Sequence, residues 1–489
     1  MHIAFAAPEC VPFSKTGGLA DVIGALPHAL ANLGHEVTVY LPRYRQTKLP
    51  PETTIALRSV TIPYDDTYRF CSVLDGGRVN QVQFYFIEYP PYFDREALYG
   101  TSLGDYPDNA ERFAMYCRAV LEASKILGVP DLFHCHDWQS ALVPILLRSV
   151  YAQDPAFMAV PSVLTIHNIG YQGLFPPDTL PLLMLPWDLF TISKLEFFGK
   201  VNFLKGALVF SDFVTTVSKK YGQEIQTAEY GFGLEGVLKS RAASVTGILN
   251  GVDYTEWNPE TDKFITNPYS LQDLSGKAED KKDLLAAFGA DKDKVDSSLP
   301  VIGIVSRFAA QKGFDLMSLV VDRLAREDMI ICALGTGDKE YEDMFRRLSK
   351  QFPNKILIKI AYDNALAHKI EAGADMFLMP SRYEPCGLNQ IYSLKYGTVP
   401  IVRATGGLDD TIENWDAKTG KGTGFKFVDY TGEGLLSAIR AALTAYKDRE
   451  GWQKLMRNGM TKDYSWASSA KEYVKVYERA SVMRSNVVI

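Results

Sequence analysis

A glycine-rich loop near the start of the chain has the composition of an anion-binding turn. It contains Lys15, Gly17, Gly18 and Asp21, and it joins a short apolar run to the first helical stretch. Glycines in such a loop let backbone N–H groups approach an anion at the positive end of a helix, and Lys15 adds a charge. The pattern predicts a phosphate site, but a tight turn with a surface lysine has the same composition.

Two cations follow an apolar run in the second half of the chain. Arg307 comes directly after the run, and Lys312 lies in the next loop. Together they could neutralise a diphosphate leaving group, although a solvated loop has the same pattern. Asp291 and Asp293 have DxD spacing but lie in a charged, weakly structured stretch. We therefore expect a surface feature there and no metal site.

A carboxylate and a glycine pair follow two further apolar runs. Glu384 comes after residues 376–379, where it could hold sugar hydroxyls or stabilise the start of a helix. Thr405, Gly406 and Gly407 follow residues 399–402 and could offer more backbone donors to a phosphate, or form a simple turn. The second half thus has several candidate ligands for an anion and for sugar hydroxyls.

Histidines follow two apolar runs of the first half. His167 comes after residues 162–166, where a neutral imidazole could hydrogen-bond a sugar hydroxyl or serve only the structure. His134 and His136 alternate onto one face of a strand, but no third ligand indicates a metal. Asp137 follows them directly and is the candidate catalytic carboxylate of this half.

Alternating strands and helices must position all of these loops. The first half has candidate strands at 2–7, 36–41, 132–135, 162–166 and 213–217, and the second at 301–305, 330–334, 356–360, 376–379 and 399–402. This pattern predicts two α/β domains, residues 1–245 and 246–464. An amphipathic C-terminal helix, about 465–489, should pack back on the first domain. Open α/β sheets bind ligands at the carboxyl ends of their strands, so we expect both domains to line one cleft.

Composition excludes several classes of protein. The 489 residues carry a formal net charge of −6 and no basic run, so nucleic acid is not expected as a partner. The six cysteines show no CxxC pair, which favours a reducing compartment. No stretch reaches 18 apolar residues, so no membrane association is expected. These features predict a cytoplasmic protein, or one of the plastid stroma if a transit peptide is missing.

Taken together, the motifs resemble the glycogen and starch synthase family. The matching segments are residues 15–22 (KTGGLADV), 136–139 (HDWQ), 165–168 (TIHN), 248–251 (ILNG), Arg307 with 311–313 (QKG), and 384–388 (EPCGL). Residues 106–113 and the segment 464–466 also match in order and spacing. The resemblance extends from residue 1 to about 480, and no single motif carries it.

The resemblance implies a fold, a reaction and a set of substrates. The fold would be GT-B, with two Rossmann-like domains facing across a deep cleft that closes before chemistry. The enzyme would transfer glucose from ADP-glucose to the non-reducing 4-hydroxyl of an α-1,4-glucan or maltooligosaccharide. It would use no cofactor or metal and would be a monomer or a weak oligomer.

The resemblance also implies roles for individual residues. Arg307 and Lys312 would neutralise the charge that develops on ADP, and Lys15 would assist them. Glu384 would hold the glucosyl hydroxyls, and His167 would bond to the 6-hydroxyl. Tyr362 would lie against the adenine. The full donor-binding set would be Lys15, Gly17, Gly18, Asp21, Asn250, Tyr362, Cys386, Gly387, Leu388, Thr405, Gly406 and Gly407.

Members of this family retain the anomeric configuration, which limits the mechanism. No second glutamate lies eight residues beyond Glu384, where Tyr392 stands. A double displacement needs a carboxylate beneath the sugar ring. Only Asp137 is available as a fallback, so we favour front-face attack, in which the donor phosphate takes the proton of the acceptor hydroxyl. The alternatives are another retaining GT-B glucosyltransferase and a catalytically silent glucan-binding scaffold.

Overall fold

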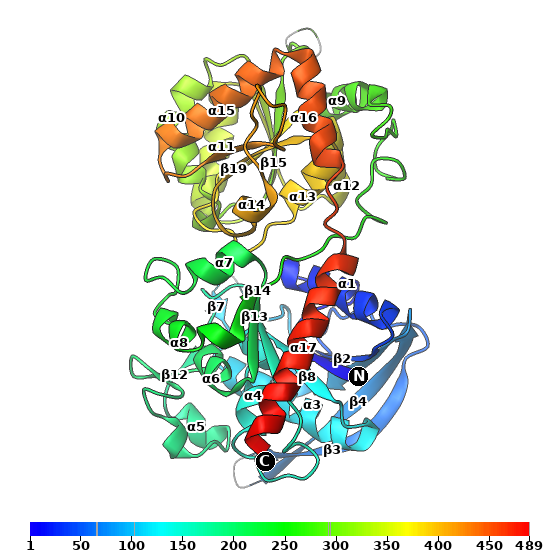
Figure 1. Ribbon diagram of the computed structural model, residues 1–489, viewed down its shortest axis with the longest axis vertical. Helices are drawn as coiled ribbons and strands as arrows, with labels where there is room; N and C mark the ends of the chain where they lie inside the picture. Colours follow the sequence, from blue (N-terminus) through cyan, green and yellow to red (C-terminus); the bar gives the residue numbers. More distant parts are fainter. Residues whose placement is uncertain (65–66, 102, 292, 294, 489) are drawn as a thin grey trace. The chain divides into compact units, whose positions relative to one another are not determined.

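A computed structural model describes residues 1–64, 67–101, 103–291, 293 and 295–488 (Figure 1). The chain folds into two compact units. Unit 1 consists of Met1–Gly251 and Trp466–Ile489, and unit 2 consists of Val252–Ser465. Each unit is built around a sheet whose strands are mainly parallel, so the prediction of an α/β fold is confirmed.

Unit 1 contains a nine-stranded sheet in the order β14-β13-β9-β8-β1-β2-β5-β4-β3. Seven neighbouring strands run parallel: β14 (Val245–Gly247), β13 (Phe213–Thr216), β9 (Ser162–Ile166), β8 (Leu132–His136), β1 (His2–Ala6), β2 (Glu36–Pro42) and β5 (Val82–Glu88). β4 (Thr67–Val79) and β3 (Thr54–Tyr64) extend the sheet antiparallel at one edge. The expected strands of the first half are therefore confirmed, and the edge pair is an addition.

Helices cover this sheet and connect its parallel strands. The main ones are α1 (Gly18–Asn32), α3 (Asn109–Leu127), α4 (Leu142–Leu147), α6 (Phe203–Phe210), α7 (Lys219–Glu224) and α8 (Glu235–Ser240). Shorter elements are α2 (Pro90–Phe93), α5 (Thr179–Leu182), the strand pair β6 (Gly100–Thr101) and β7 (Gly104–Asp105), and the small sheet of β10 (Leu174–Phe175), β11 (Glu196–Phe197) and β12 (Lys200–Asn202). Since a parallel connection needs a crossover, the long segments between strands are helical where they cover the sheet.

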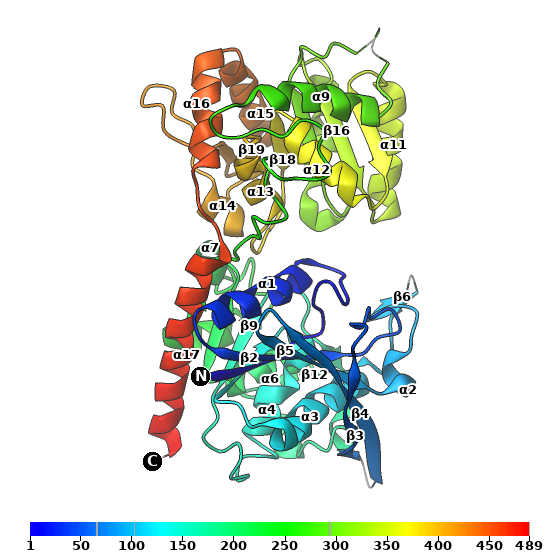
Figure 2. The ribbon, with the colours of Figure 1, turned by 90° about the vertical axis from the view of Figure 1, so that its right-hand side faces the viewer.

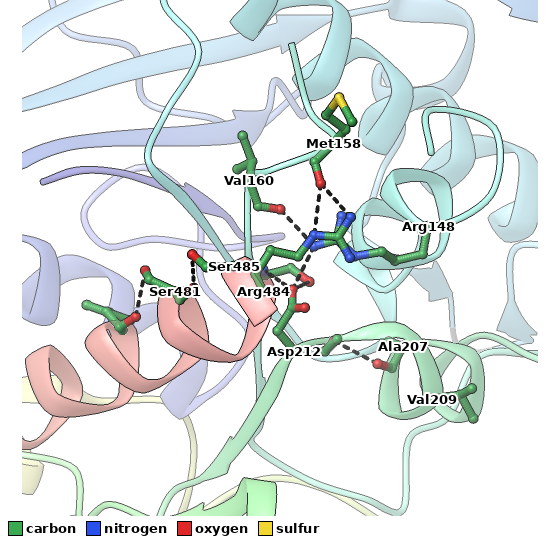
Figure 3. Close-up of polar contacts among 12 residues, drawn as sticks. Arg148, Met158, Val160, Ala207, Val209, Asp212, Ser481, Arg484 and Ser485 are labelled. Atoms are coloured by element: carbon green, nitrogen blue, oxygen red, sulfur yellow. Dashed lines mark hydrogen bonds and ion pairs between the residues drawn. The ribbon is translucent and has the colours of Figure 1, made fainter. Parts of the chain in front are cut away.

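The C-terminal helix α17 (Trp466–Val488) belongs to unit 1 and lies beside α1, as Figure 2 also shows. Trp466, Tyr473 and Tyr477 of α17 are buried in the same apolar cluster as Phe5 of β1. Near the end of α17, the Arg484 guanidinium donates to the carbonyl oxygen of Met158 (Figure 3). The expected C-terminal helix thus packs on the first half along its length.

Unit 2 contains a six-stranded parallel sheet in the order β17-β16-β15-β18-β19-β20. The strands are β15 (Val301–Val305), β16 (Ile330–Gly335), β17 (Ile356–Ile360), β18 (Met376–Met379), β19 (Val399–Arg403) and β20 (Phe425–Phe427). The helices are α9 (Ser275–Ala287), α10 (Phe314–Leu324), α11 (Lys339–Gln351), α12 (Asn364–Gly373), α13 (Asn389–Lys395), α14 (Gly406–Thr411), α15 (Gly432–Tyr446) and α16 (Arg449–Met460). Ile302 and Ile304 of β15 belong to one apolar cluster, and Val301 belongs to another. Because strand residues alternate between faces, both faces of the sheet are covered, as in a doubly wound fold.

An aromatic stack anchors the irregular segment that begins unit 2. The ring of Trp257 lies between His368 of α12 and Tyr392 of α13, with centroid distances of 3.8 and 4.0 Å. The Asp262 carboxylate accepts hydrogen bonds from His368 Nδ1, at 2.7 Å, and from the Tyr396 hydroxyl, at 2.6 Å. Tyr392 therefore serves packing at the position where some related transferases have a second glutamate.

The side chains and the hydropathy of the described residues bear on metal sites and on membrane-spanning helices. In the described part of the chain, no three His, Cys, Asp or Glu side chains gather as they would around a metal ion. Asp291 and Asp293 are exposed, and Asp291 accepts a hydrogen bond from the Asp293 backbone, at 3.1 Å, while Lys292 between them lies outside the described residues. Among the described helices, none is long and apolar enough to cross a membrane.

Candidate functional site

The loop after β1 is held together by two carboxylates. Lys15 Nζ lies 2.6 Å from Asp21 Oδ1, and both side chains are partly exposed. Glu9 is buried, and its carboxylate accepts hydrogen bonds from the amides of Thr16 and Gly17 and from the Tyr99 hydroxyl. The Gly17 amide, one of those expected to approach an anion, is therefore bonded to Glu9. The sequence analysis did not single out Glu9.

Gly17 and Gly18 lie at the start of α1, and their surroundings are open. A methyl group added to either residue would meet no atom within 4 Å. Packing within the described chain therefore gives no reason for glycine at these two positions. The open space leaves room for a ligand close to the backbone, next to the Lys15 ammonium.

His167 and Asp137 follow the neighbouring strands β9 and β8, and they are in contact. Asp137 Oδ1 accepts a hydrogen bond from the His167 amide, at 2.7 Å. Burial lowers the pKa of His167 to about 3, so its imidazole is neutral at pH 7. Asp137 has φ of 55° and ψ of −171°, a conformation of the kind that costs about 1–3 kcal/mol for residues other than glycine and clusters at active sites. Asp137 thus positions the loop that carries His167.

The Asp137 carboxyl makes the stability of the protein depend on pH. Burial raises the pKa of Asp137 to about 7, against the N–H groups of His167 and Asn168, which lower it. The folded state holds the Asp137 proton more tightly than the unfolded state does. The contribution of this carboxyl to the free energy of unfolding is therefore complete below about pH 4 and is lost as the pH rises to about 7. We expect the free energy of unfolding, relative to Asp137→Asn, to fall by at most about 1.4 kcal/mol per pH unit in this window. Urea unfolding of both proteins at pH 5 and pH 7.5 measures this, and a constant difference would contradict it.

Asn250 follows β14, the last strand of the unit 1 sheet before the chain enters unit 2. Its side chain is buried, and Oδ1 has no hydrogen-bond partner among the residues that the structure describes. The next residue, Gly251, packs so closely that an added methyl group would lie 2.6 Å from the Trp466 backbone. Asn250 is therefore fixed at the crossing point and keeps an unused acceptor.

In unit 2, Lys312 and Glu384 form a short ion pair at the ends of neighbouring strands. Lys312 Nζ lies 2.6 Å from Glu384 Oε2, which also accepts a hydrogen bond from the Ser381 hydroxyl at 2.9 Å. The Glu384 side chain is only 7% exposed, and that of Lys312 is 21% exposed. The structure thus brings together two residues that the sequence analysis assigned to different parts of the donor.

Gly406 and Gly407 follow β19 and lie against the backbone of the Glu384 loop. A methyl group on Gly406 would lie 1.8 Å from the Glu384 carbonyl oxygen, and one on Gly407 would lie 2.0 Å from that of Cys386. The Gly407 amide donates to the carbonyls of Glu384 and Pro385, each at 3.2 Å. In this structure the Gly407 amide, one of the expected phosphate donors, joins the two loops.

The remaining expected donor-binding residues of unit 2 divide into buried and exposed ones. Thr405 and Cys386 are buried, while Leu388 is half-buried beside Gly387, which has φ of 69°. Tyr362 follows β17 and is 83% exposed, so its ring is available for stacking. Arg307 is also exposed, after β15. Sequence reasoning missed Arg382 and Arg403, whose guanidinium groups lie 5.1 and 5.3 Å from the Tyr430 ring near the same strand ends.

Comparisons with known proteins place the chain in a family. Residues 2–240 match the starch synthase catalytic domain, and residues 290–458 match the glycosyl transferases of group 1. A glycogen synthase of Koribacter versatilis is 70% identical over 485 residues, covering 99% of both chains, and one of Syntrophotalea carbinolica is 44% identical, covering 98% of this chain and 99% of that one. This chain belongs to the glycogen and starch synthase family. It is accordingly a glycosyltransferase of the glucan synthase type.

Solved structures agree with this family assignment and with the GT-B fold. The catalytic domain of starch synthase IV from Arabidopsis thaliana, bound to ADP and acarbose, is 33% identical with a TM-score of 0.89, and the match covers 98% of this chain and 99% of that one. Sucrose-phosphate synthase from Thermosynechococcus elongatus is 16% identical with a TM-score of 0.59 and shares the fold. The predicted GT-B class is confirmed for this member of the synthase family.

The ion pair of this synthase depends on a glycine beside Lys312. Gly313 has φ of 74°, and a methyl group on it would lie 2.0 Å from the Pro380 carbonyl oxygen. We therefore expect Gly313→Ala to destabilise unit 2 by about 1–3 kcal/mol and to lower the melting temperature. The matched control is Gly236→Ala in α8, where an added methyl group meets no atom within 4 Å, so its melting temperature should stay the same or rise. Equal melting temperatures for both variants would contradict the close approach.

Proposed function

We propose that the protein transfers glucose from ADP-glucose to the non-reducing 4-hydroxyl of an α-1,4-glucan or maltooligosaccharide, with retention of configuration. The observation that carries this proposal is the pairing of Lys312 with Glu384 at the strand ends of unit 2. One ammonium and one carboxylate are suited to a donor with an anionic leaving group and a neutral, hydroxyl-rich sugar. The related starch synthase IV, whose structure contains ADP and acarbose, supports the same substrates.

In this proposal, unit 2 holds the donor. Lys312 and Arg307 neutralise the charge that develops on the ADP phosphates, while Glu384 turns from Lys312 to the glucosyl hydroxyls. The exposed ring of Tyr362 stacks on the adenine. The tight turns at Gly387, Gly406 and Gly407 fix the backbone around Glu384, with Thr405, Cys386 and Leu388 packed beside them.

Unit 1 contributes the groups that act on the transferred sugar and on the acceptor. The neutral imidazole of His167 bonds to the sugar 6-hydroxyl, and Lys15 releases Asp21 to meet the diphosphate beside Gly17 and Gly18. Asn250 offers its unused Oδ1 to a hydroxyl. Asp137 is already bonded to the His167 amide, which supports a positioning role and front-face attack over a covalent intermediate on Asp137.

The proposal extends to conditions and setting. The phosphate charge is balanced by Lys and Arg side chains, so the reaction should need no added metal or cofactor. All six cysteines are buried and none forms a disulfide, which supports a reducing compartment such as the cytoplasm. The protein should act as a monomer or a weak oligomer.

Labelled ADP-glucose, incubated with a short maltooligosaccharide and a chelator, tests this function. ADP release and chain length are followed together. Lengthening by single α-1,4-linked glucose units is the expected result. If the folded protein binds ADP but releases none from ADP-glucose with any glucan, the donor and acceptor are wrong. Glucan binding without transfer to any acceptor would favour the scaffold instead.

A further inference from the structure

Three buried histidines surround the ends of β8 and β9. His134 and His136 are fully buried, and His167 is 9% exposed. His136 Nδ1 lies 2.9 Å from His167 Nε2, within hydrogen-bond distance. The second ring nitrogen of His167, Nδ1, has no hydrogen-bond partner among the described residues. It is therefore the nitrogen that His167 can offer to a substrate.

The bond between the two imidazoles joins an N–H group to a lone pair. Burial holds the pKa of His136 well below its usual value and lowers that of His167 to about 3, so neither ring is charged at pH 7. A neutral imidazole has one N–H group and one bare nitrogen. Two arrangements are therefore open: either His136 donates from Nδ1, or His167 donates from Nε2.

The far side of the His136 ring decides between these arrangements. His136 Nε2 is buried and has no hydrogen-bond partner among the described residues. The ring lies flat against Phe5, with centroids 5.4 Å apart and an angle of 13° between planes. His134 is not a hydrogen-bond partner for His136 Nε2, because both of its ring nitrogens already bond to the hydroxyls of Thr165 and Tyr477. A buried N–H group without an acceptor is rarer in proteins than an acceptor without a donor, so the bare nitrogen of His136 is Nε2.

We propose that His136 is a positioning residue that fixes His167 as the Nδ1–H tautomer and so makes it a hydrogen-bond donor to the bound sugar. His136 Nδ1–H donates to His167 Nε2, and the proton of His167 must then lie on Nδ1. His167 consequently donates to a hydroxyl oxygen and has no lone pair with which to act as a base toward the substrate. This inference rests on the proposed contact between His167 and the donor sugar.

Nitrogen NMR of the folded, substrate-free protein tests the tautomer directly. The protein is labelled with ¹⁵N-histidine, which gives seven residues to resolve, and the spectrum of His167→Ala assigns the signals of His167. We expect His167 to show a protonated Nδ1 and a bare Nε2. A protonated Nε2 on His167 would overturn the proposal, whatever the activity of the enzyme.

Two substitutions of His136 test its effect on catalysis. His136→Asn places an amide N–H close to the position of Nδ1, whereas His136→Phe keeps the ring against Phe5 and removes the donor. We expect the turnover number to fall about 10- to 100-fold in the phenylalanine variant, by analogy with the loss of hydrogen-bond partners of metal-bound histidines. The KM for ADP-glucose should change little. The asparagine variant should restore most of the turnover.

The outcomes separate this inference from the proposed function. Wild-type turnover in His136→Phe would overturn the positioning role. An equal loss of turnover in both variants would also overturn it, provided that both melt at the wild-type temperature. If either variant fails to fold, the wild-type NMR spectrum alone decides the tautomer. A wild-type enzyme without glucosyl transfer would instead refute the proposed function and leave the tautomer assignment standing.

Discussion

Replacing Lys312 by alanine should lower the turnover number about 10²- to 10³-fold, or roughly 3 to 4 kcal/mol in the activation free energy. The ammonium lies 2.6 Å from Glu384 Oε2, at the strand end where we place the leaving diphosphate. Its loss removes charge stabilisation from the transition state and leaves the Glu384 carboxylate without its ion-pair partner. Steady-state kinetics with ADP-glucose and maltooligosaccharide measure the effect.

A second lysine of unit 2 provides the matched control. Lys369 of α12 also forms a short ion pair, at 2.7 Å from Asp283, and has a similar exposure of 28%. It lies outside the loops that carry Glu384 and Gly406, so Lys369→Ala should keep wild-type turnover. Arg307→Ala should resemble Lys312→Ala, since both cations follow β15. Wild-type turnover in Lys312→Ala would remove this lysine from the mechanism.

Replacing His167 by alanine should reduce the turnover number about 10²-fold while changing donor affinity much less. The reason is that a donor fixed in position stabilises the reacting sugar more strongly in the transition state than in the ground state. Stopped-flow or calorimetric binding of ADP-glucose, together with the turnover number, separates the two effects. A rise in the dissociation constant with unchanged turnover would make His167 a simple binding residue.

His35 is the control for this histidine. It is partly exposed in the turn between α1 and β2, far in sequence from the loops after β8 and β9. His35→Ala should leave turnover and donor affinity unchanged. The melting temperature of His167→Ala should be measured together with its kinetics, because the substitution also leaves His136 Nδ1 without its hydrogen-bond partner.

The parallel strands were predictable from sequence because they are buried on both faces. Residues of β8 and β9 are buried throughout, and such strands read as continuous apolar runs bounded by polar loops. The loops that follow β8, β9, β15 and β18 contain Asp137, His167, Lys312 and Glu384, respectively. Since ligands of open α/β sheets bind at these strand ends, the candidate residues could be located before the structure was known.

Other features depend on contacts that no local pattern reveals. β3 is largely exposed, with a mixed burial pattern that does not alternate regularly, so its strand period is weak. Glu9 carries no motif of its own, and only the folded loop shows that its carboxylate binds the Thr16 and Gly17 amides. The sequence pattern indicates a phosphate-binding glycine at Gly407. In the structure, however, a side chain is excluded there by the Cys386 carbonyl, 21 residues earlier in the chain.

The return of α17 to unit 1 has a consequence for synthesis on the ribosome. The surface of unit 1 that receives Trp466, Tyr473 and Tyr477 is apolar, and His134 obtains one of its two partners from Tyr477. Translation must first pass from Val252 to Ser465, which takes about 10 to 40 s at roughly 5 to 20 residues per second. During this interval the apolar surface that α17 later covers is open to chaperones and to other nascent chains. Unit 1 therefore gains the apolar contacts of α17 only after unit 2 has been synthesised.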